Sequence, residues 1–157
     1  MNRTLVAIDP GAKGGIAIFH GHKDISLHNL ETDLDELYAQ LWIPAAVKVM
    51  VEDVGYHRAG NHAQSSATFA RHCGHIDMAL TAHDLDFAKV KPEVWMRNAL
   101  GAGRPRNKTE RKIWIKKRVQ AMFPQLKVTL QTADALGILV YLAQIQGVDF
   151  KSLDTRY

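Results

Sequence analysis

Cysteine is nearly absent from this 157-residue chain, in which Cys73 stands alone. One thiol cannot form an internal disulfide, and it cannot supply the thiolates of a structural zinc site. Runs of apolar residues long enough to cross a membrane are also missing. The first residues lack the apolar stretch and the cleavage site of a signal peptide. We therefore expect a cytoplasmic protein with no membrane segment, whose stability comes from packing.

The size and composition are those of one compact domain. A chain of 157 residues can bury most of its surface in a single core, and 46% hydrophobic with 23% charged residues is ordinary for a globular protein. We find no internal repeat and no low-complexity segment. The sequence therefore predicts one domain over residues 1–146, followed by a short polar tail at 147–157.

Acidic residues are scarce between Lys89 and Arg118, where Glu93 and Glu110 stand among many lysines and arginines. The whole chain has a net charge of +4, and its positive charge is concentrated in this segment. Such a concentration indicates a polyanionic partner such as nucleic acid, although the solvated face of an ordinary helix can be equally basic. We interpret the segment as a candidate DNA-binding surface.

The first part of the chain predicts a three-stranded meander. Residues 4–9 and 14–19 are β-branched and apolar runs separated by Pro10 and Gly11, which favours a hairpin. Residues 24–30 alternate more weakly and are expected to add a third strand.

Helices and strands alternate after the meander, as apolar spacing, capping residues and helix breakers indicate. A β-meander followed by parallel crossovers gives an α/β architecture, with a five-stranded mixed sheet and helices on both faces. The predicted elements are a helix over 30–41, a strand over 47–51, a helix over 69–80, a strand over 86–91, and helices over 92–100, 107–123 and 133–146.

Three acidic residues stand where such a sheet places its ligand sites. Asp9 ends the first predicted strand and Glu52 the fourth, and the carboxyl ends of parallel strands meet at one sheet edge. Asp134 lies in the first turn of the last helix, where unpaired amide groups favour an anion. Clustered carboxylates repel one another unless a hard cation such as Mg²⁺ or Mn²⁺ binds them. Taken singly, Asp9 also fits a turn and Asp134 a helix start.

Three stretches around these acids resemble the acidic motifs of the RuvC-type Holliday junction resolvases: AIDPGAKGG, VMVEDVG and TADALGILVYL. The middle of the chain is similar to phage members of that family, with a Pro-x-x-Trp pattern before a glycine loop at residues 101–103. The resemblance covers nearly everything before the tail. It implies a ribonuclease H-like fold and a homodimer that cuts Holliday junctions and other branched DNA, with the second helix as the dimer interface.

The resemblance also implies two-metal-ion hydrolysis of a phosphodiester, which leaves 5′-phosphate and 3′-hydroxyl ends. Asp9, Glu52, Asp134 and Gln131 are the implied ligands of two Mg²⁺ or Mn²⁺ ions, and no small-molecule cofactor is implied. The family usually has an acid or a histidine at the position of Gln131. An amide oxygen carries no charge, so the second metal is expected to bind more loosely, through water, or with a substitute ligand such as Asp53.

Basic and aromatic residues are expected to contact the DNA. Lys108 matches a family position that helps to bind the scissile phosphate, which makes it a candidate catalytic residue as well. Tyr56 lies where family members present an aromatic ring to an unstacked base, although it fits equally well as a residue packed on its own loop. The predicted DNA-binding residues are Tyr56, Arg58, Arg104, Arg106, Lys108, Arg111 and Lys112.

Other functions stay open at this point. DPGAKGG also resembles the first phosphate loop of actin-like ATPases and sugar kinases, but those proteins need a second loop and an adenosine-binding segment in a second domain. A junction-binding protein that does not cleave is compatible with Gln131 and the basic surface. Other ribonuclease H-like enzymes, such as hydrolases of RNA hybrids or relatives that process pre-rRNA, are a further alternative.

Two further pairs of residues have ordinary explanations. His72 and His75 share a helix face, but the additional ligands that a zinc site needs are not evident. Trp95 and Trp114 are expected in the core or at an interface rather than against a substrate.

Overall fold

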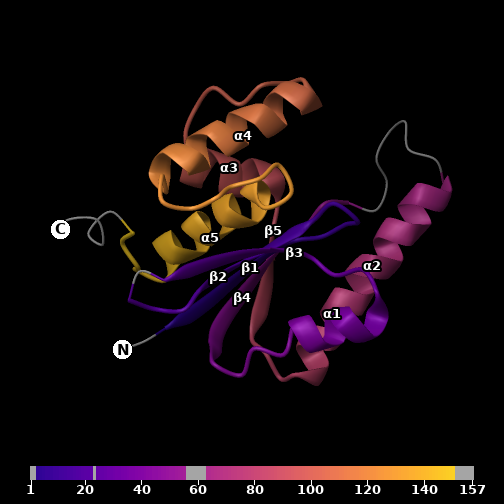
Figure 1. Ribbon diagram of the computed structural model, residues 1–157. Coiled ribbons are helices and arrows are strands. Elements are labelled where there is room, and N and C mark those ends of the chain that lie inside the picture. Colours follow the sequence, from indigo (N-terminus) through magenta and orange to yellow (C-terminus); the bar gives the residue numbers. More distant parts are fainter. Residues whose placement is uncertain (1–2, 23, 56–62, 151–157) are drawn as a thin grey trace.

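The structure is a computed structural model that describes residues 3–22, 24–55 and 63–150. Its five strands form one mixed sheet in the order β3-β2-β1-β4-β5 (Figure 1). Neighbours β1, β2 and β3 are antiparallel, and β4 and β5 continue the sheet in parallel with β1. The predicted five-stranded mixed sheet is therefore confirmed. The strands are β1 (Thr4–Asp9), β2 (Gly15–Phe19), β3 (Ile25–Asn29), β4 (Ala46–Glu52) and β5 (Phe87–Val90).

Helices cover both faces of the sheet, as predicted (Figure 1). Helices α1 (Leu34–Gln40) and α2 (Ala63–Ala82) lie on one face. On the other face α5 (Ala133–Ile145) packs directly on β1, β2 and β4, while α3 (Pro92–Leu100) and α4 (Lys108–Met122) pack against α5. The core is thus split by the sheet into two apolar layers.

Side chains along each strand pack alternately in the two apolar layers, since successive side chains of a strand point to opposite faces. In β1, Leu5 and Ala7 pack with the α3–α5 layer, whereas Val6 and Ile8 pack with α1 and α2. In β4, Met50 belongs to the α3–α5 layer. Odd-numbered positions of β1 and even-numbered positions of β4 therefore face α5.

Two helices begin at places that the apolar spacing did not predict. Helix α1 begins after Asp33, whose carboxylate accepts hydrogen bonds from the backbone N–H groups of Asp35 and Glu36, at 3.1 Å each. Leu30, the first leucine of the predicted helix, is buried instead at the end of the meander. Helix α2 begins at Ala63, well before the predicted start, because its first turns are largely exposed and carry no apolar period.

The residues after α5 return to the core. Phe150 packs edge-on against Phe19 and Phe123, with ring centroids 5.2 and 5.6 Å away. The predicted boundary between domain and tail at residues 146 and 147 stays a prediction. Within the described ranges, no helix combines the length and apolar character that a membrane span requires.

Candidate metal centre

The sheet brings Asp9 and Glu52 together. Strands β1 and β4 are parallel neighbours, and their last registered pair is Ile8 with Val51. Asp9 and Glu52 are the next residues along the two strands, and both occupy positions that face α5. The register and the side-chain alternation therefore place two carboxylates side by side at the carboxyl edge of the sheet, where ligand sites of open α/β sheets lie.

Gly15 allows the third carboxylate to reach them. Gly15 pairs with Asp9 across β1 and β2, and a Cβ atom built on it would lie 2.5 Å from the carbonyl oxygen of Gln131. That carbonyl belongs to the segment that leads into α5, so any side chain at position 15 would push the start of the helix away from the sheet. Asp134, in the first turn of α5, is thereby held over the strand ends.

Asp9, Glu52 and Asp134 form one cluster, in which a ligand oxygen from each lies within 4.8 Å of the others. Glu52 is 6% exposed, and the other two acids are half-buried. Three carboxylates this close repel strongly in a partly desolvated site, and a divalent cation relieves that repulsion. The donor set is all hard oxygen, which fits Mg²⁺ or Mn²⁺ rather than zinc. The convergence of the three acids is as predicted, and the identity of the ion stays a prediction.

The expected fourth ligand, Gln131, lies just before the helix that carries Asp134. Gln131 precedes α5, and its carbonyl oxygen is the atom nearest to a Cβ built on Gly15. Its role as a metal ligand stays a prediction. Asp53, the substitute considered from the sequence, is exposed. Glu93, an acid of the basic segment that was not expected as a ligand, lines the same cleft as the acidic cluster.

The acidic cluster opens into a cleft of about 570 Å³ that is bordered by cationic side chains. Most of these cations come from α4 and from Arg104 in the loop before it, so the basic helix lies beside the acids. Negative charge at the sheet edge therefore faces positive charge on α4. The basic residues that line the cleft are Lys13, Arg104, Lys108, Arg111 and Lys112.

One predicted DNA contact, Arg111, also has a structural role. Its Nε and Nη2 atoms donate hydrogen bonds to the carbonyl oxygens of Pro105 and Arg106, at 3.1 and 2.7 Å. Partial burial and the neighbouring positive charge of Arg104 lower the pKa of Arg111, while Asp134 acts in the opposite direction. The guanidinium thus holds the loop that presents Arg104 to the cleft.

Arg118 holds the other half of the same loop. Its Nη1 and Nη2 atoms donate to the carbonyl oxygens of Leu100 and Ala102, at 2.6 and 3.2 Å, and its guanidinium lies 4.8 Å from the ring centroid of Trp114. Arg111 and Arg118 are two helical turns apart and therefore share one face of α4. The basic run thus contains arginines that build the loop as well as cations that line the cleft.

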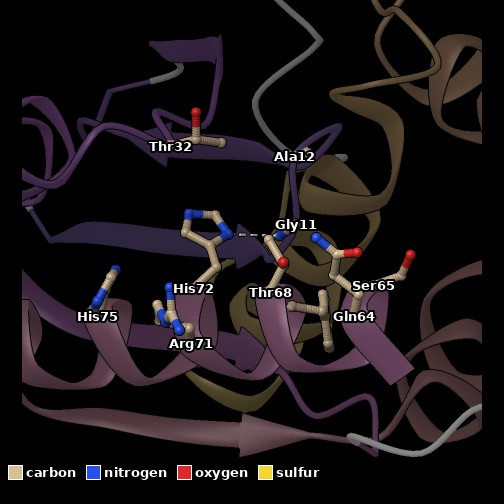
Figure 2. A pocket seen from close by; sticks show the side chains of 10 residues that line it. Gly11, Ala12, Thr32, Gln64, Ser65, Thr68, Arg71, His72 and His75 are labelled. Carbon is tan, nitrogen blue, oxygen red and sulfur yellow. Dashed lines mark hydrogen bonds between the residues drawn. The ribbon is translucent and has the colours of Figure 1, made fainter. Parts of the chain in front are cut away.

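His72 on α2 supports the loop after Asp9 from the opposite side of the sheet (Figure 2). Its Nδ1 atom accepts a hydrogen bond from the backbone N–H of Gly11 at 3.1 Å. Its Nε2 atom lies 3.1 Å from the carbonyl oxygen of Glu31, which can only accept, so the ring is neutral with its proton on Nε2. Burial lowers the pKa of His72, which favours this neutral form. His72 is therefore a structural residue that holds the loop after Asp9, and its position on the same helix face as His75 needs no metal to explain it.

Trp95 is a core residue, as expected, and its partner is one that the sequence did not reveal. The side chain is fully buried on α3, and its Nε1 atom donates a hydrogen bond to Oε2 of Glu52 at 2.5 Å.

Tyr56 and Arg58, both predicted to contact DNA, lie outside the described residues.

No protein-family model matches this sequence, and a search of curated proteins finds no match either. Among solved structures, Thermus thermophilus RuvC is similar over 92% of this chain and 97% of its own, with a TM-score of 0.56 and 15% sequence identity. The chain has a RuvC-like fold. A structure of T. thermophilus RuvC in complex with Holliday junction substrate is similar over 92% of this chain and 96% of its own, with a TM-score of 0.55 and 14% identity. The RuvC-like fold confirms the predicted ribonuclease H-like class.

Proposed function

We propose that this protein is a metal-dependent endonuclease that cuts Holliday junctions and other branched DNA. The observation that carries the proposal is the cluster of Asp9, Glu52 and Asp134 within 4.8 Å, in a cleft bordered by cations, on a RuvC-like fold. One of the similar solved structures is that of T. thermophilus RuvC in complex with Holliday junction substrate, which supports junction DNA as the ligand class.

The chain's own residues divide the chemistry between them. The three acids would hold Mg²⁺ or Mn²⁺, with Gln131 as the proposed fourth ligand, and the bound ions would supply an activated water and stabilise the leaving oxygen. Lys108 lines the cleft and would bind the scissile phosphate, where its charge offsets the negative charge that grows in the transition state. Water adds to phosphorus as the bond to the 3′ oxygen breaks, which gives 5′-phosphate and 3′-hydroxyl ends.

The DNA backbone would run along the basic side of the cleft. The side chains of Arg104, Lys108 and Lys112 line it, and in the described part of the chain these side chains form no hydrogen bond or ion pair with another residue. These cations are therefore available to phosphates, and each phosphate contact releases counterions, so affinity should fall steeply with salt. Arg106 from the loop before α4 and Arg111 from α4 itself are proposed to add contacts, and Tyr56 and Arg58 are proposed to contact the DNA as well.

Cutting two symmetric strands of a junction calls for two active sites. We therefore propose a homodimer with α2 at the interface, because a two-fold axis in the protein would match that of the junction. Helix α2 presents Met78, which is 67% exposed, to such a partner. Sedimentation of the purified protein would test this: a monomer at micromolar concentration contradicts the dimer. A cytoplasmic location stays a prediction.

The decisive test is cleavage of a labelled four-way junction and a matched linear duplex, with and without Mg²⁺ or Mn²⁺. Wild type should cut the junction selectively and only with metal, and Asp9→Asn should bind the junction without cutting it. Binding without cutting by the wild type would favour a junction-binding protein, the alternative that the uncharged Gln131 keeps open. Metal-dependent cutting of both DNAs alike would favour a less selective nuclease of the same fold.

A further inference from the structure

Glu52 has a hydrogen-bond donor that reaches it from outside the sheet. Nε1 of Trp95 donates to Oε2 of Glu52 at 2.5 Å, from α3 to the end of β4. Both side chains are buried, with Trp95 at 0% and Glu52 at 6% exposure. A hydrogen bond to an ionised group in such surroundings is stronger than a neutral one, because little water competes for either partner. The indole N–H therefore fixes the rotation of the Glu52 carboxylate.

The same indole is wedged against the helix that carries Asp134. A Cβ atom built on Gly137 of α5 would lie 2.5 Å from Cζ3 of Trp95, so the six-membered ring rests on the helix backbone where a side chain is missing. Gly137 lies about one helical turn after Asp134. Trp95 thus contacts one acid directly, through its N–H, and touches the helix of a second through its ring.

A tryptophan that only filled the core would not need a carboxylate as its hydrogen-bond acceptor. Buried indole N–H groups find an acceptor in most proteins, and a backbone carbonyl serves as well as a carboxylate. Here the acceptor is a member of the acidic cluster, and the ring is locked on the opposite side by a glycine. Side chains that orient metal ligands through hydrogen bonds typically change metal affinity by about 10–100-fold when they are removed.

We propose that Trp95 is a positioning residue for the metal centre, which sets the orientation of the Glu52 carboxylate and its distance from Asp134. The inference rests on the proposed function, since it assigns the acidic cluster to metal binding. It predicts that the Trp95 N–H contributes to the affinity for the ion, even though Trp95 does not contact the ion or the DNA.

The test measures Mn²⁺ binding to the full-length protein without DNA, by calorimetry and by the electron paramagnetic resonance of free Mn²⁺. Trp95→Phe removes the donor and part of the ring. A second variant, with 3-benzothienylalanine incorporated at position 95, keeps the ring shape and replaces only the N–H by sulfur, so it stays informative if Trp95→Phe folds poorly. The matched control is Trp114→Phe, the same exchange at an indole that packs on the same apolar layer and lies beneath Arg118.

Both Trp95 variants should raise the Kd for Mn²⁺ by about 10–100-fold, while Trp114→Phe should leave it unchanged. In a Glu52→Gln background, Trp95→Phe should cause no further loss, because the oriented carboxylate is already gone. Wild-type affinity in a folded benzothienylalanine variant would overturn the positioning role and leave the nuclease proposal intact. Equal, weak Mn²⁺ binding by wild type and Glu52→Gln would overturn both, since the acids would then hold no metal.

Discussion

The Nδ1 atom of His72 accepts a hydrogen bond from the backbone N–H of Gly11, two residues after Asp9, and this bond connects α2 to the loop that follows β1. The arrangement requires a neutral imidazole, because a protonated Nδ1 cannot accept. Burial accordingly lowers the pKa of His72 below its ordinary value of 6.5. The loop beside the acidic cluster is therefore held by a group whose charge state depends on pH.

Stability should fall in acid through this histidine. The unfolded chain protonates His72 near pH 6.5, whereas the folded chain resists protonation to lower pH, so the stabilisation is complete above about pH 6.5 and declines below it. The slope is at most about 1.4 kcal/mol per pH unit for one proton. Urea unfolding of wild type and His72→Gln from pH 5 to 8 measures this contribution. The contributions of the other histidines cancel in the difference between the two free energies of unfolding. A difference that is constant with pH would contradict the assignment.

Gly15→Ala should damage the metal centre through the backbone. The added Cβ would meet the Gln131 carbonyl at 2.5 Å, so the start of α5 must move, at a cost of about 1–3 kcal/mol for overpacking. Mn²⁺ affinity should fall as Asp134 is displaced. The matched control is Gly74→Ala on α2, where the Cβ meets nothing within 4 Å and the exchange should be neutral or stabilising. Similar thermal unfolding of the two variants would refute the contact argument.

Lys108→Ala should depress cleavage more than binding. A cation that binds the scissile phosphate acts mainly as charge develops in the transition state, so a loss of about 10²–10³ in the cleavage rate is expected with a small change in junction affinity. Lys117→Ala on the same helix removes an exposed lysine that does not line the cleft, and it should leave the rate near wild type. Single-turnover cleavage beside a gel-shift titration separates the two quantities; equal losses in rate and affinity would argue against the assigned role.

Two arginines of the basic segment should respond in opposite ways. Arg104→Ala should lower junction affinity and reduce the slope of log affinity against log salt by about one, with unfolding unchanged, because Arg104 lines the cleft. Arg118→Ala should lower the free energy of unfolding by about 1–2 kcal/mol with an unchanged salt slope, because its guanidinium is bound to Leu100 and Ala102. Salt titrations and urea unfolding of both variants measure the two effects. A loss of stability in Arg104→Ala and a changed salt slope in Arg118→Ala would contradict these roles.

Much of the fold follows from local pattern in the sequence. Apolar alternation and turn residues set the strands of the meander, and the helix expected from residue 107 begins where the Asn107 side chain accepts a hydrogen bond from the backbone N–H of Glu110. The carboxyl-end positions of Asp9 and Glu52 predicted their convergence, because parallel neighbours share an edge. The start of α2 escaped prediction, since an exposed polar helix turn leaves no apolar period to read.

The sequence by itself determined the elements, their order and the three acids, because each depends on residues a few positions apart or on strand ends. Only the tertiary structure decided which side chains support the site. It placed Trp95 against Glu52, Gly15 against the start of α5, and His72 against Gly11. These contacts join residues far apart in the chain. The type of residue at a position does not reveal which distant group will lie beside it, so the partners of a tryptophan, a glycine or a histidine cannot be read from the sequence.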